Sequence, residues 1–234
     1  MQKLMIDNLN VNFGGLYSLQ VEKLSLNESG EILAILGRNG AGKTTLLNAI
    51  LDLIPHNGSV KILGIKNNET SGLWKEKTGI FIDDSFLIDY FYPEEYFELI
   101  SSFIKDNLFD LDEFYNEFKD FFANEILNEK KLIKSFSKGN KAKIGIAGAL
   151  LHHPQLIILD EPSAHLDNSS KQQLIKILLR RKEMQHASVL FATHDLDMVM
   201  DIADRIVILK DGQLALNLAV ADIDKETIIN LLST

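Results

Sequence analysis

The stretch Gly37-Arg38-Asn39-Gly40-Ala41-Gly42-Lys43-Thr44-Thr45 decides the fold of this chain. It fits the pattern G-x-x-x-x-G-K-[ST], in which glycines let successive backbone N–H groups converge on one anion. An apolar run at residues 31–36 predicts a buried strand before it, and residues 46–51 have the spacing of a helix. We therefore expect Lys43 to reach the β and γ phosphates of a nucleotide and the Thr44 hydroxyl to bind Mg²⁺. The alternative, a chance glycine turn, lacks this strand–loop–helix context.

Composition limits what the chain can do. It has 234 residues, 46% of them hydrophobic, with a net charge of −9 and no cysteine. A disulfide framework and a thiolate metal site are therefore excluded, and the negative charge argues against a nucleic-acid groove. We see no secretory signal and no apolar stretch of the roughly 18 residues that span a membrane. The sequence predicts a soluble protein that needs a partner for any role at a membrane.

A second apolar run ends in two acids. Residues 155–159 predict a buried central strand, and Asp160 and Glu161 follow it directly. Asp160 is placed to bind the Mg²⁺ of a phosphate-loop site, and Glu161 to act as a general base on water. His194 follows another predicted strand at 188–192 and is expected at the same sheet edge, where it could bind a γ phosphate or orient Glu161. A surface acidic pair and a structural histidine are the alternatives.

Other segments leave two interpretations open. Phe13 could stack on a base or belong to the core. Ser137, with Gly139, could cap a predicted helix or bind an anion there. Asp83 and Asp84 end a predicted strand at 78–82, near a ligand site or in a solvated loop. Asn57-Gly58 predicts a tight turn before a strand at 59–65.

Residues 86–134 are rich in aromatic and acidic side chains. Helical spacing between residues 111 and 122 predicts an amphipathic helix, and Pro93 with two glutamates predicts the start of another. We expect most rings to form the core of a helical subdomain. A minority could form an exposed docking patch for a partner helix.

Taken together, these motifs resemble those of the nucleotide-binding subunit of an ABC transporter, over nearly the whole chain. GRNGAGKTT at 37–45 is similar to the Walker A loop, LIILDEP at 156–162 to Walker B with its catalytic glutamate, and FSKGN at 136–140 to the LSGGQ signature. SAHLD at 163–167 looks like the D-loop, and His194 matches the switch histidine. Phe13 matches the aromatic residue that stacks on adenine. The signature segment looks closest to exporters of the antibiotic- and peptide-resistance type.

The resemblance implies an α/β P-loop NTPase with a RecA-like core, an N-terminal antiparallel β subdomain and an inserted α-helical subdomain. We expect one domain, with the core at about residues 1–85 and 153–234 and the helical subdomain at about 86–152. The nucleotide ligands implied are Phe13, the loop residues Gly37, Arg38, Asn39, Gly40, Ala41, Gly42, Lys43, Thr44 and Thr45, and Ser137 and Gly139 of a second subunit. The catalytic residues implied are Glu161 and His194, and the metal ligands are Thr44, Asp83 and Asp160.

The family also implies partners: a head-to-tail dimer with a second copy or a paralogue, ATP and Mg²⁺ between the two, and an integral membrane permease that would hold the protein at the inner face of the cell membrane. Three residues depart from the family pattern. Asp83 stands where a glutamine is usual, Lys138 replaces a signature glycine, and Asn140 ends the signature segment in place of its usual residue. The alternative function is a regulatory ATPase of the same type that acts on a soluble machine such as the ribosome or DNA.

Overall fold

A single twisted sheet organises the computed structural model, which describes residues 2–12, 14, 18–27, 30–104 and 110–233. Within that part of the chain the sheet has ten strands in the order β5-β4-β1-β2-β10-β9-β3-β8-β7-β6. The strands are β1 (Leu4–Asn12), β2 (Ser18–Leu26), β3 (Ile32–Leu36), β4 (Asn57–Ile62), β5 (Ile65–Lys66), β6 (Thr78–Phe81), β7 (Leu156–Asp160), β8 (Ser188–Thr193), β9 (Arg205–Lys210) and β10 (Gln213–Ala219).

Five neighbouring strands are parallel. β3 pairs with β8 and β9, and β7 pairs with β6 and β8, all in parallel register. Every residue of β3, β7 and β8 is buried, as their continuous apolar runs predict for strands covered on both faces. Because parallel strands end at one edge of the sheet, the loops after β3, β7 and β8 meet there. This edge carries the candidate site.

The other strands are largely antiparallel. β1 pairs with β2 and β4, and its alternating burial is the period-2 pattern of a sheet with one buried face. β10 pairs antiparallel with β9 and touches β2 through Gln213 and Gln20. The predicted turn at Asn57-Gly58 is wrong: both residues lie inside β4.

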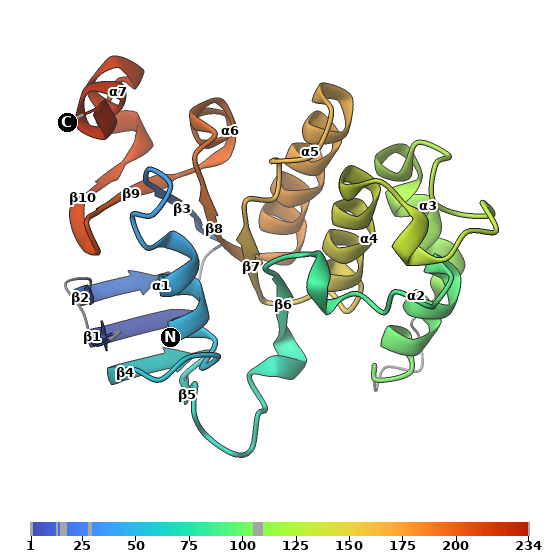
Figure 1. The fold of residues 1–234 in the computed structure, drawn as a ribbon, viewed down its shortest axis with the longest axis horizontal. Coiled ribbons are helices and arrows are strands. Elements are labelled where there is room, and N and C mark those ends of the chain that lie inside the picture. Colours follow the sequence, from blue (N-terminus) through green and yellow to red (C-terminus); the bar gives the residue numbers. More distant parts are fainter. Residues whose placement is uncertain (1, 13, 15–17, 28–29, 105–109, 234) are drawn as a thin grey trace.

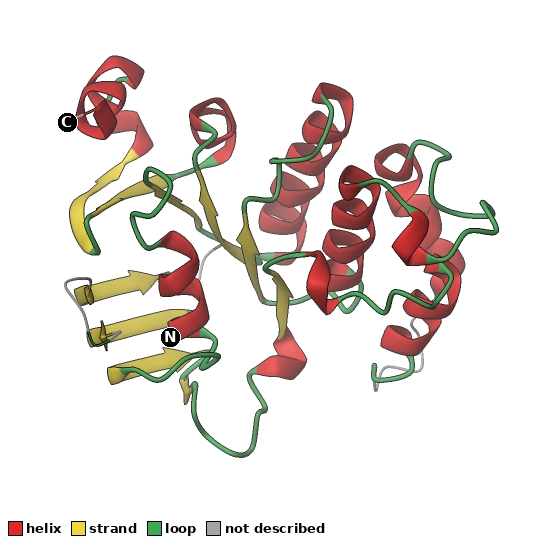
Figure 2. Ribbon diagram, in the orientation of Figure 1, coloured by secondary structure: helices red, strands yellow, loops and turns green. Residues whose placement is uncertain are grey.

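Helices cover both faces of the sheet (Figure 1). They are α1 (Lys43–Ile50), α2 (Pro93–Ser101), α3 (Leu111–Phe122), α4 (Lys138–Leu150), α5 (Asn168–Gln185), α6 (Leu196–Ile202) and α7 (Lys225–Ser233), with 3-10 turns η1 (Lys75–Lys77), η2 (Asp84–Phe86), η3 (Ile133–Ser135) and η4 (Val220–Asp222). Figure 2 shows that α2 and α3 stand beyond β6, the last strand of the sheet. Among the described residues, no helix combines the length and apolarity needed to cross a bilayer.

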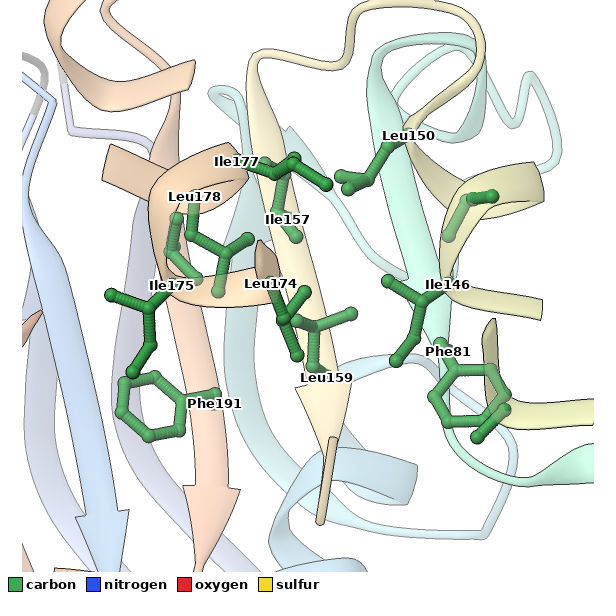
Figure 3. Packing of buried hydrophobic residues seen from close by; sticks show 14 of the residues in the cluster. Phe81, Ile146, Leu150, Ile157, Leu159, Leu174, Ile175, Ile177, Leu178 and Phe191 are labelled. Carbon is green, nitrogen blue, oxygen red and sulfur yellow. The ribbon is translucent and has the colours of Figure 1, made fainter. Parts of the chain in front are cut away.

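Two apolar clusters hold these layers together. One lies between α1 and the face of the sheet that includes β1 and β2, and the other joins the sheet to α3, α4 and α5. In the second cluster Leu159 of β7, Leu174 of α5 and Ile146 of α4 converge (Figure 3). Because this cluster runs unbroken from the sheet into the helices, the helical segment packs as part of one core. The boundaries of the core and helical subdomains stay a prediction.

Aromatic side chains fill the centre of the helical segment, as the sequence predicts. Phe97, Phe114 and Phe118 are at most 4% exposed, and the rings of Phe97 and Phe114 meet edge to face at 5.1 Å. A minority of rings remain on the surface, among them Phe86 at 63% and Tyr90 at 73% exposure.

Candidate functional site

The glycine-rich loop joins β3 to α1 at the carboxyl edge of the parallel strands. Gly42 is the N-cap of α1 with φ of 107°, a left-handed conformation that only glycine adopts without strain. No side chain caps α1 and its first turn holds no acid. Its first N–H groups therefore stay available to an anion. The loop lines an open cavity of about 480 Å³ together with Lys43, Thr45 and Glu161.

Lys43 and Thr44 each contact one of the two acidic residues at the end of β7. The buried Lys43 ammonium donates to the Gly37 carbonyl at 2.9 Å and lies 3.3 Å from Glu161 Oε1. The Thr44 hydroxyl donates to Asp160 Oδ2 at 2.5 Å. The structure thus brings together the loop and the two acids that the sequence assigned to one site.

Asp160 has the environment of a metal ligand. It is 6% exposed, and its Oδ1 atom is buried without a hydrogen-bond partner among the described residues. Burial raises the pKa of this carboxyl, and the charges of Glu161 and Asp83 raise it further, against the lowering effects of the Thr44 hydrogen bond and Lys43. A divalent cation would remove this penalty, so Asp160 and Thr44 fit Mg²⁺. The described residues offer no cluster of three acids or histidines arranged for a metal.

Glu161 is held by several donors. One carboxylate oxygen accepts hydrogen bonds from the Thr193 hydroxyl at 3.1 Å, the His194 backbone N–H at 3.2 Å and the His194 ring Nδ1 at 2.9 Å. Its backbone adopts φ of 44°, a left-handed conformation that costs a non-glycine residue about 1–3 kcal/mol. Glu161 and His194 are therefore adjacent, as expected. Thr193 was missed, although its place as the last residue of a buried strand could have suggested it.

Three predicted site residues lie apart from this cluster. Asp83 caps η2 by accepting from the Ser85 N–H at 2.7 Å, and it influences Asp160 only through its charge. Ser137 caps α4, its hydroxyl accepting from the Asn140 N–H at 3.2 Å, and Gly139 belongs to the same helix start. None of these three residues lines the cavity at the glycine loop. Phe13 lies outside the described residues.

The start of α4 packs tightly against the loop after β7. A Cβ on Gly139 would lie 2.5 Å from the His165 carbonyl oxygen, so this approach requires glycine. Asp167 caps α5 by accepting from the Ser170 N–H at 2.8 Å. The segment 163–167, which follows Glu161, therefore packs against the start of α4 at Gly139.

A protein-family profile described as "ABC transporter" matches residues 21–164. The chain belongs to this family. The uncharacterised ABC transporter ATP-binding protein YdbJ of Bacillus subtilis is 30% identical over 96% of this chain and 71% of its own length. The SkfA peptide export ATP-binding protein SkfE of the same organism is 32% identical over 88% and 85%. The taurine import ATP-binding protein TauB of Shigella boydii is 31% identical over 89% and 80%.

Solved structures of ABC cassettes share the fold. cbiO1 from Clostridium perfringens, part of the ABC transporter complex cbiONQ, is 25% identical with a TM-score of 0.76, covering 99% of this chain and 92% of that one. The dimeric cassette MJ0796, bound to ADP and Pi, is 24% identical with a TM-score of 0.76, and the match covers 93% of this chain and 98% of that one. At this identity the similarity shows the fold alone. As an ABC ATP-binding subunit, the chain binds and hydrolyses ATP.

Proposed function

We propose that this ABC subunit energises export by a separate membrane subunit. The observation that carries its catalytic part is the cluster of Lys43, Glu161 and His194 beside the glycine loop. Export is supported by the peptide-export relative SkfE and by the form of the signature segment. The taurine-import relative is about equally similar, so direction must be decided by transport in vesicles. Net uptake of substrate into cells by the complete system would refute export.

The residues at the cavity have separate tasks in this proposal. The loop N–H groups and Lys43 bind the β and γ phosphates. Asp160 and Thr44 would hold Mg²⁺, which when bound supplies positive charge to the phosphate oxygens. Glu161, oriented by Thr193 and His194, accepts a proton from the attacking water. Lys43 also pairs with Glu161, so a phosphate that binds this lysine replaces the contact and leaves the carboxylate available as the base.

A second copy or a paralogue completes the site. Ser137 and Gly139 lie at an exposed helix start that does not line the chain's own cavity. We propose that they bind the γ phosphate of ATP held by another subunit, in a head-to-tail pair. The N–H groups at the start of α4 would then act on an anion across the interface.

Trapping the ATP-bound pair tests this arrangement. Glu161→Gln should dimerise with ATP and Mg²⁺, because binding is kept and hydrolysis is lost. The matched control, Glu161→Gln with Lys43→Ala, should stay monomeric because it lacks the phosphate contact. Light scattering measures both. A monomeric Glu161→Gln protein with bound ATP would refute the head-to-tail site.

An apolar hollow beside Asp83 is the proposed contact with the permease. It measures about 270 Å³ and is lined by Trp74, Phe86, Leu87 and Tyr96. Phe86 exposes 63% of its surface there. Exposure of so much apolar surface to water is unfavourable, and such exposure is typical of a site that binds a partner. A helix of the permease would cover it and hold the subunit at the inner face of the membrane. Phe86→Asp should abolish co-purification with a multi-span membrane protein; recovery of RNA or DNA instead would favour the regulatory alternative.

A further inference from the structure

The loops after β7 and β8 are joined by one carboxylate, that of Asp195. Its Oδ2 atom accepts a hydrogen bond from the Ser163 hydroxyl at 3.1 Å, and the Lys171 ammonium of α5 lies 2.6 Å from the same oxygen. Its Oδ1 atom accepts from the Met198 N–H at 3.0 Å and so caps α6. The carboxylate therefore ties the loop after β7 to α5 and to the start of α6.

The backbone of Asp195 is linked to Glu161 through Thr193. The Asp195 N–H donates to the Thr193 hydroxyl oxygen at 3.0 Å, and that hydroxyl donates to Glu161 Oε2 at 3.1 Å. A backbone N–H can only donate, so it occupies a lone pair of the hydroxyl and leaves the hydroxyl proton for the carboxylate. Thr193 is fully buried, which keeps water from replacing either bond. The position of Asp195 therefore sets the direction of a hydrogen bond that Glu161 accepts.

The His194 ring depends on the same loop. Its side chain is 60% exposed, and its Nδ1 atom lies 2.9 Å from Glu161 Oε2. Because an exposed ring has few neighbours to hold its rotamer, the backbone on either side must set where the ring lies. The Thr193 hydroxyl holds that backbone on one side, and the Asp195 carboxylate holds it on the other.

We propose that Asp195 is a positioning residue for ATP hydrolysis. Its carboxylate holds the loop after β8 against Ser163, so that Thr193 and His194 keep Glu161 in one orientation. Asp195 acts through its position more than its charge, because the Lys171 ammonium offsets that charge at short range. This inference rests on the role of Glu161 as general base proposed above.

Steady-state ATP hydrolysis by the full chain tests this role. Misplacing a catalytic group by about 1 Å can cost about a hundredfold in rate. Asp195→Ala removes the contacts of the carboxylate but keeps the backbone N–H, so we expect a smaller loss, about thirtyfold in kcat. KM for MgATP should stay within about threefold, because the glycine loop and Lys43 are unchanged. Asp195→Asn should cost at most about fivefold in kcat, since its amide can still bond the Met198 N–H and the Ser163 hydroxyl.

Two further variants define what a loss of kcat means. Asp224→Ala is the matched control, because Asp224 caps α7 through the Thr227 N–H at 2.8 Å and does not line the cavity at the glycine loop. It should change kcat less than about twofold. Ser163→Ala keeps the cap of α6 and removes only the bond between the two loops, so it should lower kcat about fivefold. In the Asp195→Ala protein the same change should cost less than about twofold, since that bond is already lost.

The outcomes separate this inference from the proposed function. In the Glu161→Gln background, Asp195→Ala should change the single-turnover rate less than about twofold, because Asp195 acts through Glu161. An equal loss in both backgrounds would overturn the positioning role and leave Glu161 as the base. Hydrolysis at the wild-type rate by Glu161→Gln would refute both. Wild-type kcat in Asp195→Ala, with a raised KM or a lowered urea midpoint, would assign Asp195 to binding or folding and overturn the inference. If Asp195→Ala does not fold, Ser163→Ala provides the same comparison.

Discussion

The most exacting test of the packing concerns Arg181, a charged residue inside the layer between α5 and α3. Its side chain is 1% exposed, and Nη2 donates to Glu117 Oε2 of α3 at 2.9 Å. Neutral acceptors complete its surroundings: Gln185 Oε1 at 3.0 Å, the Leu150 carbonyl at 3.4 Å and the His153 ring. Burial lowers the pKa of Arg181, and the Glu117 charge opposes that effect. Glu117→Gln leaves the buried guanidinium without the only carboxylate that pairs with it among the described residues.

The expected cost follows from this geometry. Removing one partner of a buried ion pair costs about 3–5 kcal/mol. We expect the lower end, about 3 kcal/mol, because neutral acceptors remain and Glu117 is 17% exposed. In a chain of this size that corresponds to a fall of about 6–12 °C in Tm. Arg181→Met should cost less, about 1 kcal/mol, because it also removes the Nε atom that has no hydrogen-bond partner among the described residues.

Urea unfolding followed by circular dichroism measures these differences. Glu129→Gln is the control: its Lys131 pair is exposed on both sides, at 54% and 36%, and should contribute less than about 0.5 kcal/mol. The unfolding midpoint should fall for Glu117→Gln with an unchanged slope. A loss no larger than that of Glu129→Gln would show that the guanidinium is solvated. A larger loss for Arg181→Met than for Glu117→Gln would show that its packing matters more than its charge.

Three further changes have defined outcomes. Burial raises the pKa of Asp160, so the folded protein loses stability as pH rises through the range between the ordinary and the raised value. Asp160→Asn should therefore raise Tm at neutral pH while ending hydrolysis, and an unchanged Tm would contradict this. Gly139→Ala places a Cβ 2.5 Å from the His165 carbonyl oxygen, so it should lower the free energy of unfolding in urea by about 1–3 kcal/mol and slow ATP hydrolysis. Wild-type values of both quantities would argue against the close packing. Burial lowers the pKa of His152, so the stability that its neutral ring contributes falls as pH drops below about 6.5. His152→Gln should therefore weaken the dependence of Tm on pH between about pH 7 and 5. The same pH dependence of Tm in variant and wild type would exclude His152 as the cause.

Local spacing predicted the parts of the fold that local physics determines. The glycine loop, the run ending in Asp160 and the helix at 111–122 each follow from period and motif within a short window. The turn at Asn57-Gly58 failed because the glycine serves a distant contact. A Cβ on Gly58 would lie 2.1 Å from the Asn8 carbonyl oxygen, so close strand packing, not chain reversal, requires glycine.

The site shows the same division. Asp160 and Glu161 could be found because a buried strand that ends in two acids is a local pattern. The end of a buried strand marks Thr193 as a candidate, but spacing does not pair it with Glu161, since this hydrogen bond joins residues 32 positions apart across neighbouring strands. The sequence comparison predicts that Asp83 is a metal ligand, but in the structure its carboxylate accepts a hydrogen bond within its own loop. Sequence spacing predicts the sheet edge at which a side chain lies, but it does not predict the hydrogen-bond partner of that side chain.

In the mechanism proposed above, the contact between Lys43 and Glu161 links nucleotide binding to catalysis within one chain. The ammonium that a phosphate must recruit is 3.3 Å from the carboxylate that must later activate water. When a phosphate takes this lysine, Glu161 keeps its bonds to Thr193 and His194 and gains freedom to accept a proton. In this proposal the ion pair therefore makes activation of the base depend on the phosphate that Lys43 binds.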